Sequence, residues 1–201
     1  RIYADEPIVE VPEVTLGERS FPADVTELNL GGLELADITE LAQCTALKKL
    51  DLRDNEITDL SPLAACTELE WLCLWNNQVE DLSPLAALEN LRYLDIDTNA
   101  VTNVIALEGL TKMEELWLSN NELLNIEPLR GMTKLTRLGL KKFRICINNR
   151  RVLNGFYEMQ GLKEKSGDIM RTVDKLDKIG ADKVRLCLID DCALTQTQAD
   201  E

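Results

Sequence analysis

Residues 69–90 read LEWLCLWNNQVEDLSPLAALEN, and this stretch decides the fold. Leucines stand at its first, fourth and sixth places and an asparagine at its ninth, and apolar residues follow at places 11, 14, 17 and 20. The same spacing recurs on both sides, so the chain is built from an internal repeat of 22 residues. The units begin at Val25, Leu47, Leu69, Leu91, Met113 and Leu135.

The first half of each unit alternates with period two, which predicts a short strand. The fourth and sixth places then face a core, and the third, fifth and seventh places face outward. One unit cannot bury its own leucines, so stacked units must share a continuous core beneath a parallel sheet. The segment DLSPLA, residues 59–64, predicts a tight helical turn on the other side. Asp59 or Ser61 can cap that turn, and Pro62 suits a first helical position.

The ninth place holds an asparagine in four successive units. Its amide can turn the chain and bond to backbone groups of the neighbouring unit. We therefore expect a structural ladder of side-chain amides. The ladder residues are Asn55, Asn77, Asn99 and Asn121.

The pattern LxxLxLxxN with an apolar second half resembles the leucine-rich repeat family from residue 25 to about residue 142. ITDLSPLAACTELEWL (57–72) and VEDLSPLAALENLRYL (79–94) are most similar to the short-repeat bacterial class, as in internalins and related surface proteins. The resemblance implies an α/β solenoid, with short parallel strands on a concave side and short helical turns on a convex side.

Residues outside the repeats divide into four segments. Residues 1–13 are expected to be an extended lead-in, and residues 14–24 an N-terminal strand or hairpin cap over the first unit. Residues 143–190 predict a small α/β cap, with strands at 143–147 and 183–190 and a helix over 166–180. Residues 191–201 are interpreted as a tail.

Composition excludes several classes of function. The 201 residues carry a net charge of −14, which argues against nucleic acid as a partner. No apolar run approaches the roughly 20 residues of a membrane span. Residues 135–185 hold 13 bases and 6 acids, which indicates either an anionic contact or the solvated face of a cap. Because the sequence starts at Arg1 without an apolar signal, we interpret it as part of a longer protein.

Catalytic and metal chemistry have little support in the sequence. The chain has no histidine, no CxxC pair and no glycine-rich phosphate loop, so we expect neither an enzyme nor a cofactor. Cys73 lacks the basic neighbour that a reactive thiolate needs. Cys44 and Cys66 share one core place, where a disulfide is conceivable but buried thiols are preferred. Five cysteines have no disulfide state assigned by the sequence: Cys44, Cys66, Cys146, Cys187 and Cys192, of which the last two could bridge in an oxidising compartment.

The outward places of the strands gather all three tryptophans. Trp71, Trp75, Tyr93 and Trp117 should form an aromatic patch over the third to fifth units. The predicted surroundings are the acids Asp51, Asp95, Asp97 and Glu115, with the bases Arg53, Arg137 and Lys141 at the rims. Cys73 is expected to face outward between two tryptophans. The acids indicate a solvated rim, with calcium as the alternative.

Grouped exposed aromatic residues usually mark a contact surface. The concave patch is therefore predicted to bind a protein ligand, or else a glycan. Cover by the C-terminal segment or by a second copy in a weak dimer, and an idle surface, remain the alternatives. The resemblance implies an extracellular or surface-anchored binding module. The other possibility is a cytoplasmic scaffold or regulatory subunit that binds a protein.

Overall fold

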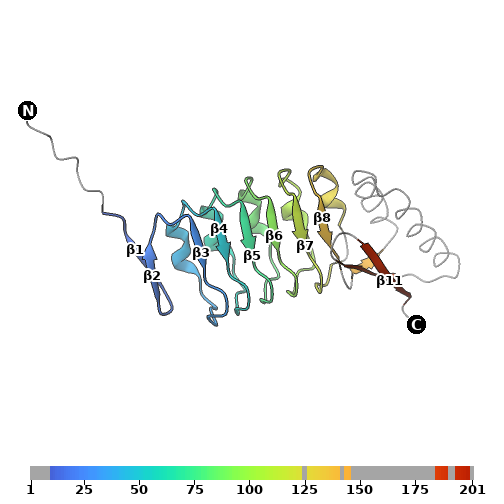
Figure 1. The fold of residues 1–201 in the computed structure, drawn as a ribbon, viewed down its shortest axis with the longest axis horizontal. Helices are drawn as coiled ribbons and strands as arrows, with labels where there is room; N and C mark the ends of the chain where they lie inside the picture. The colour runs from blue at the N-terminus through green and yellow to red at the C-terminus, as the bar shows by residue number, and fades with distance from the viewer. Residues whose placement is uncertain (1–9, 124–125, 141–142, 146–183, 190–192, 200–201) are drawn as a thin grey trace, which may run out of the picture.

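The computed structural model describes residues 10–123, 126–140, 143–145, 184–189 and 193–199. Its centre is a six-stranded parallel sheet in the order β3-β4-β5-β6-β7-β8 (Figure 1). Neighbouring strands pair residues 22 positions apart, as in Leu50 with Leu72 and Leu72 with Leu94. The repeat length therefore sets the register, and the predicted solenoid fold is confirmed. The strands are β3 Glu27–Asn29, β4 Lys49–Asp51, β5 Trp71–Cys73, β6 Tyr93–Asp95, β7 Glu115–Trp117 and β8 Arg137–Gly139.

Short 3-10 helices lie on the side of the coil opposite the sheet (Figure 1). At η2, Asp59 accepts bonds from the backbone N–H of Ser61 at 2.8 Å and from its hydroxyl at 2.6 Å. The Asp59 side chain thus turns the chain into the helix, and Pro62 follows near its start. The helices are η1 Thr39–Gln43, η2 Ser61–Ala65, η3 Ser83–Ala87, η4 Ile105–Leu107 and η5 Glu127–Gly131.

The core lies between the sheet and these helices. Leucines such as Leu50, Leu72 and Leu94 are fully buried, and truncating one to alanine typically costs about 2–5 kcal/mol. Cys44 and Cys66 are buried in the same core as free thiols, so no disulfide joins them. Burial raises the pKa of Cys66 to about 11. The side chains of Cys146, Cys187 and Cys192 lie outside the part that the structure describes.

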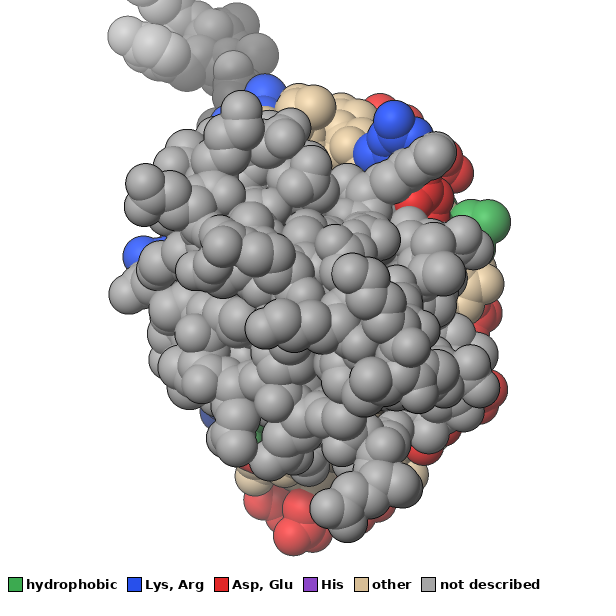
Figure 2. All heavy atoms as spheres, turned by 90° about the vertical axis from the view of Figure 1, so that its right-hand side faces the viewer, with side chains coloured by type: hydrophobic (Ala, Val, Ile, Leu, Met, Phe, Trp, Pro, Cys, Tyr) green, Lys and Arg blue, Asp and Glu red, His purple; other side chains and the backbone are tan. Residues whose placement is uncertain are grey.

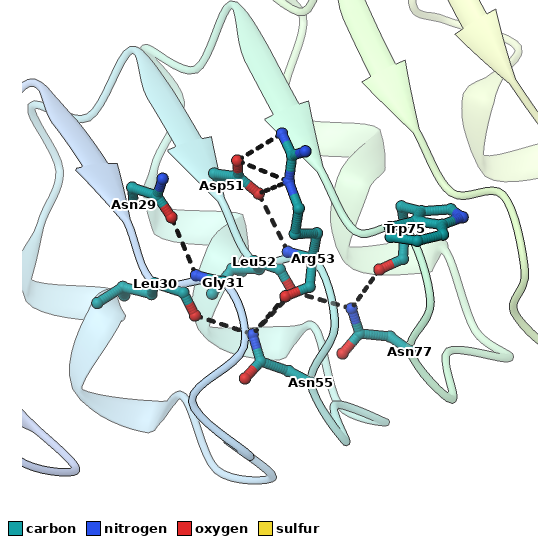
Figure 3. A network of polar contacts seen from close by, with 9 residues as sticks. All are labelled: Asn29, Leu30, Gly31, Asp51, Leu52, Arg53, Asn55, Trp75 and Asn77. Atoms are coloured by element: carbon teal, nitrogen blue, oxygen red, sulfur yellow. Dashed lines mark hydrogen bonds and ion pairs between the residues drawn. The ribbon is translucent and has the colours of Figure 1, made fainter.

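The ninth-place asparagines bond to backbone groups of two successive units. The Asn77 amide nitrogen donates to the carbonyl oxygens of Leu52 at 2.9 Å and Leu74 at 3.1 Å. Its oxygen accepts the N–H of Ile57 at 3.0 Å. Asn55, Asn99 and Asn121 make corresponding bonds. Figure 3 shows the bonds of Asn55 to the carbonyl oxygens of Leu30 and Leu52, and the bond of Asn77 to the carbonyl oxygen of Leu52. The ladder thereby satisfies backbone groups where the strands end.

An antiparallel hairpin of β1 (Glu13–Leu16) and β2 (Arg19–Pro22) precedes the first unit. Its turn contains Gly17 at φ +59°, a conformation that glycine adopts without steric cost. Val14, Leu16 and Phe21 are buried in the common core. The hairpin therefore covers apolar surface that the first unit would otherwise expose.

A second sheet lies beyond β8, in the order β11-β10-β9 (Figure 1). Strands β9 (Phe143–Ile145) and β10 (Val184–Ile189) fall within the two predicted strands. The interpretation of residues 191–201 as a tail is wrong in part, because Ala193–Ala199 forms β11. This segment pairs with the second edge of β10, and its threonines favour extended backbone. The helix predicted over 166–180 lies outside the described residues. Within those residues, no helix has the length and apolar character needed to span a bilayer.

Candidate functional site

We call the outward side chains at the third, fifth and seventh places of the six-stranded sheet the sheet face. Each of the strands β4 to β8 contributes two outward residues around one buried leucine. Residues 22 positions apart therefore lie side by side, which brings the aromatic residues together. Trp71 of β5 is paired with Tyr93 of β6, and Cys73 with Asp95. Trp117 of β7 is paired with Asp95 on the other side.

Trp71 and Tyr93 stack face to face. Their ring centres are 4.8 Å apart and their planes differ by 10°. The ammonium group of Lys49, from β4, lies 5.1 Å from the centre of the Trp71 ring, within the range of a cation–π contact. Lys49 was not among the predicted site residues, although it occupies the same third place one unit earlier. The residues at the third place of the second, third and fourth units thus form a continuous row of a cation, an indole and a phenol across β4, β5 and β6.

Asp51 and Arg53 form an ion pair at one border of the aromatic residues (Figure 3). The Nη2 atom of Arg53 lies 2.7 Å from Oδ2 of Asp51. The Nε–H of Arg53 donates to both carboxylate oxygens of Asp51, at 2.9 Å each. Asp51 is only 7% exposed, so its expected place in an exposed acidic surround is wrong. Arg53 lies over it, and Gly31 leaves the space, since a Cβ there would be 2.9 Å from Arg53 Cγ.

Cys73 faces outward but is only 3% exposed, so its expected exposure is also wrong. Its small side chain lies lower than the larger residues on neighbouring strands, which shield it from water. Burial raises the pKa of the thiol to about 12. The thiol is therefore protonated at neutral pH and has little nucleophilic character.

A pocket of about 310 Å³ opens on the sheet face above Cys73. Its lining residues are Arg53, Cys73, Trp75, Tyr93, Asp95, Asp97 and Trp117. All of these residues except Cys73 are predicted from the sequence as site residues. The pocket therefore joins residues from four successive units in one concave place.

Asp95 is a partly buried acid of the pocket. Burial raises the pKa of its carboxyl group, and this effect outweighs the hydrogen bonds that the Asp97 N–H, at 3.0 Å, and the Tyr93 hydroxyl donate to it. Burial and the negative charge of Asp95 raise the pKa of Tyr93 as well, which keeps the phenol protonated as a donor.

Trp75, at the pocket edge, is 39% exposed.

Trp117 closes the far side of the pocket. A Cβ at Gly139 would lie 2.5 Å from its ring, so the glycine gives the indole room to lie against β8. Asp97 accepts a hydrogen bond from the Ser119 N–H of the next unit. Beyond Trp117, Arg137 pairs with Glu115 at 3.3 Å on an exposed surface. Such exposed pairs contribute little to stability.

The calcium alternative finds no support in this geometry. Glu115 faces Arg137, and Asp97 holds a backbone N–H. Among the residues that the structure describes, no group of three or more cysteine, aspartate or glutamate side chains is arranged to hold a metal ion. Lys141, predicted at the rim, lies outside the described residues.

A family model of leucine-rich repeats, in two copies, matches residues 25–65 and 67–111. An internalin (inlF) from Listeria monocytogenes is 28% identical, with a TM-score of 0.64 over 70% of this chain and 42% of that chain. An internalin C2 from the same species is 35% identical, with a TM-score of 0.59 over 59% of this chain and 53% of that chain. The matched residues carry leucine-rich repeats of the short, 22-residue type, and this part of the chain folds as a leucine-rich repeat solenoid. Within that class it resembles the internalins.

Histidine–tRNA ligases share a short stretch with this chain. The ligase of Wolinella succinogenes is 44% identical over 62 residues, and that of Thermobifida fusca is 49% identical over 62 residues. Each match covers 31% of this chain and 14% of the ligase. The chain thus spans about a seventh of the length of the ligases that it matches.

Proposed function

We propose that this chain is a non-enzymatic binding module that holds a protein partner on its sheet face. Trp71, Trp75, Tyr93 and Trp117 are the anchors. The observation that carries the proposal is the pocket among the last three of these residues, beside the stacked Trp71 and Tyr93. Tryptophan, tyrosine and arginine are the residues most enriched at binding hot spots, because they bury large areas with few rotatable bonds.

Local order of the site supports binding over an idle surface. The Trp71 ring is held by Tyr93 and Lys49, the Tyr93 hydroxyl by Asp95, and the Trp117 ring by the backbone of β8. Side chains ordered before binding lose less conformational entropy when a partner arrives. The leucine-rich repeat fold adds support, since solenoids present extended surfaces of this kind to protein partners.

We further propose that the module acts outside the cell, as a secreted or surface-attached protein. Its resemblance to internalins supports this location. A cytoplasmic scaffold is the competing proposal. Brief protease treatment of intact source cells, followed by immunoblotting, separates the two: loss of the protein supports the external location, and full retention with a digested surface marker contradicts it.

The similarity to histidine–tRNA ligases supports no proposal of ligase activity, because it covers about a seventh of those enzymes. The acidic repeats also suit a protein partner better than a polyanion. Figure 2, which looks onto the C-terminal end, has acidic side chains gathered along its lower and right-hand rim. Such a field attracts basic partners and repels nucleic acid.

In the test, the wild-type chain and a Trp71→Ala/Trp75→Ala/Trp117→Ala variant are each immobilised, and both are exposed to the same extract of candidate partner cells. Protein partners held by the wild type should be lost from the triple variant. Thermal unfolding of both proteins checks that the variant is folded. The matched control is Ile105→Ser, which removes a 62% exposed apolar side chain away from the sheet face and should capture like the wild type.

Identical capture by wild type and triple variant would contradict the sheet face as the binding site. Capture that survives protease treatment of the extract but not glycosidase treatment would replace the protein partner by a glycan.

A further inference from the structure

We propose that the pocket on the sheet face binds the guanidinium group of an arginine side chain that the protein partner presents. This inference rests on the proposed function and names the chemistry of the group that the pocket selects. Four features of the pocket support it: its aromatic walls, its carboxylates, the state of Arg53 and the neighbouring contact of Lys49.

The walls are flat aromatic rings from three successive units. Trp75 comes from the third unit, Tyr93 from the fourth and Trp117 from the fifth. The faces of indole and phenol rings carry partial negative charge, so they attract cations within about 6 Å of the ring centre. A pocket with such walls favours a cationic group over a neutral or anionic group of the same size.

The pocket also contains the carboxylates of Asp95 and Asp97. The contacts that Asp95 makes are with neutral donors, the Asp97 N–H and the Tyr93 hydroxyl. Within the part of the chain that the structure describes, Asp95 has no ion pair within 4 Å. A half-buried carboxylate without a cation gains much from an incoming positive charge.

Arg53 lines the same pocket, and its positive charge acts on Asp95 from a distance, but it forms its ion pair with Asp51. Asp51 lies against its guanidinium at 2.7–2.9 Å and neutralises it. The charge that remains around the pocket is therefore negative. Arg53 also serves as a local example of a guanidinium held by a carboxylate on this surface.

Lys49 supplies a second example. Its ammonium group lies 5.1 Å from the centre of the Trp71 ring, and Trp71 in turn stacks on Tyr93 of the pocket wall. An aromatic ring of the sheet face thus already holds a cation from its own chain. Trp75 and Trp117 offer the same kind of surface to a cation from outside.

The shape of the pocket favours arginine over lysine. A guanidinium is planar, stacks on aromatic rings and donates five hydrogen bonds in a fixed fork. Asp95 is the last residue of β6, and Asp97 follows two residues later at the next outward place of the same unit. Both carboxylates line the pocket, so a stacked guanidinium can donate toward both. An ammonium group is compact and strongly hydrated, and it gains less from flat walls.

The experiment titrates the full ¹⁵N-labelled chain with three probes, the N-acetyl amides of arginine, lysine and citrulline. Citrulline keeps the planar shape of arginine without its charge. The indole N–H signals of Trp75 and Trp117 are followed by NMR and assigned with single Trp→Phe variants. We expect both signals to shift saturably with the arginine probe, with an apparent affinity about tenfold above that for citrulline.

Two variants sharpen this test. Asp95→Asn removes the half-buried charge, keeps a side-chain oxygen to accept the Asp97 N–H, and should weaken the arginine probe about five- to tenfold. Glu89→Gln removes the same charge from an exposed position outside the sheet face and should change nothing. Equal affinity for citrulline, equal or higher affinity for lysine, or unchanged arginine binding by Asp95→Asn would each overturn the inference.

Failure here is distinguishable from failure of the proposed function. If the triple tryptophan variant loses its protein partner while the arginine probe shifts no indole signal, the sheet face binds by another chemistry. If the triple variant keeps every partner, the proposed function itself is wrong, whatever the probe does.

Discussion

The asparagine ladder and the sheet face lie on the same units, yet they differ in one respect. The ladder repeats one residue in four units, and each amide bonds to the backbone of its own unit and of its neighbour. The sheet face changes at every unit, and its aromatic rings and Asp95 retain capacity for a further partner. Within one repeat, identical residues hold the backbone, whereas the residues that we propose for recognition vary from unit to unit.

The difference has a physical cause. A repeated place meets the same backbone geometry in every unit, so one side chain satisfies it every time. An outward place meets the side chains of both neighbouring units, so its surroundings are set by whichever residues those units carry. Substitutions at repeated places and at outward places separate these two causes.

Asn77→Ala should lower the free energy of unfolding by about 3 kcal/mol. The change leaves the buried N–H of Ile57 without its acceptor, which costs about 1–3 kcal/mol. It also removes one of the two amide donors from each of the carbonyl oxygens of Leu52 and Leu74, at about 0.5–1.5 kcal/mol for each lost bond, while Asn55 and Asn99 still donate to them. Urea unfolding followed by circular dichroism measures the loss. The control is Asn76→Gly at the exposed neighbouring position. Glycine readily adopts the φ of +55° found there, so this change should cost under about 1 kcal/mol. Similar losses for both variants would contradict a special role for the ninth place.

Gly139→Ala should destabilise the chain by about 1–3 kcal/mol and displace Trp117. The new Cβ meets the indole at 2.5 Å, so the ring must move off β8. Unfolding and the tryptophan emission maximum report the two effects. Gly109→Ala, where a Cβ meets no atom within 4 Å, should show neither. An unshifted emission spectrum in Gly139→Ala would show that the sheet face does not depend on this close contact.

Asp95→Asn should raise the free energy of unfolding at neutral pH, by up to about 1 kcal/mol. Burial raises the pKa of Asp95 above its unfolded value, so the ionised carboxylate opposes folding at neutral pH. This gain in stability should shrink as the pH falls through the pKa that Asp95 has in the folded chain. It should vanish below the pKa that Asp95 has in the unfolded chain, because the wild-type carboxyl group is then protonated in both states. Unfolding at a series of pH values measures it.

Removing the charge of Asp59 should change stability at neutral pH in the opposite direction to removing that of Asp95. Hydrogen bonds from Ser61 lower the pKa of Asp59, so its ionised form supports folding above the unfolded pKa, and this support is lost as pH falls through the folded pKa. Asp59→Ala should therefore lower stability at neutral pH and matter less in acid. If both variants change stability with the same sign, the contrast between structural and outward acids is wrong.

Thr98→Asn should stabilise the chain by about 0.5–1 kcal/mol, the smallest effect. Thr98 has φ +59°, which is unfavourable for a β-branched residue, whereas asparagine tolerates it at the same place in Asn76 and Asn120. The reverse change, Asn76→Thr, should cost a similar amount. Differential scanning calorimetry of both variants measures the shift, and an unchanged melting temperature in each would refute the strain.

Much of the fold follows from spacing, because a period of 22 residues with an inner period of two determines strands, register and core. The same arithmetic places Trp71 beside Tyr93, and the structure stacks them. The burial of Asp51 and Cys73 does not follow from it. Exposure on a sheet depends on the length and direction of side chains on the neighbouring strands, and the sequence gives their identity without their rotamers. The cation over Trp71 was missed for the same reason.

The stack of Trp71 on Tyr93 also makes the sheet face its own optical reporter. Two aromatic chromophores held 4.8 Å apart with nearly parallel planes couple electronically, and excitation of the phenol passes to the indole. Such coupling falls steeply with separation and changes sign and size with mutual orientation. Near-ultraviolet circular dichroism and phenol-excited indole emission therefore register any rearrangement of these two strands, so ligands can be screened on the unlabelled chain.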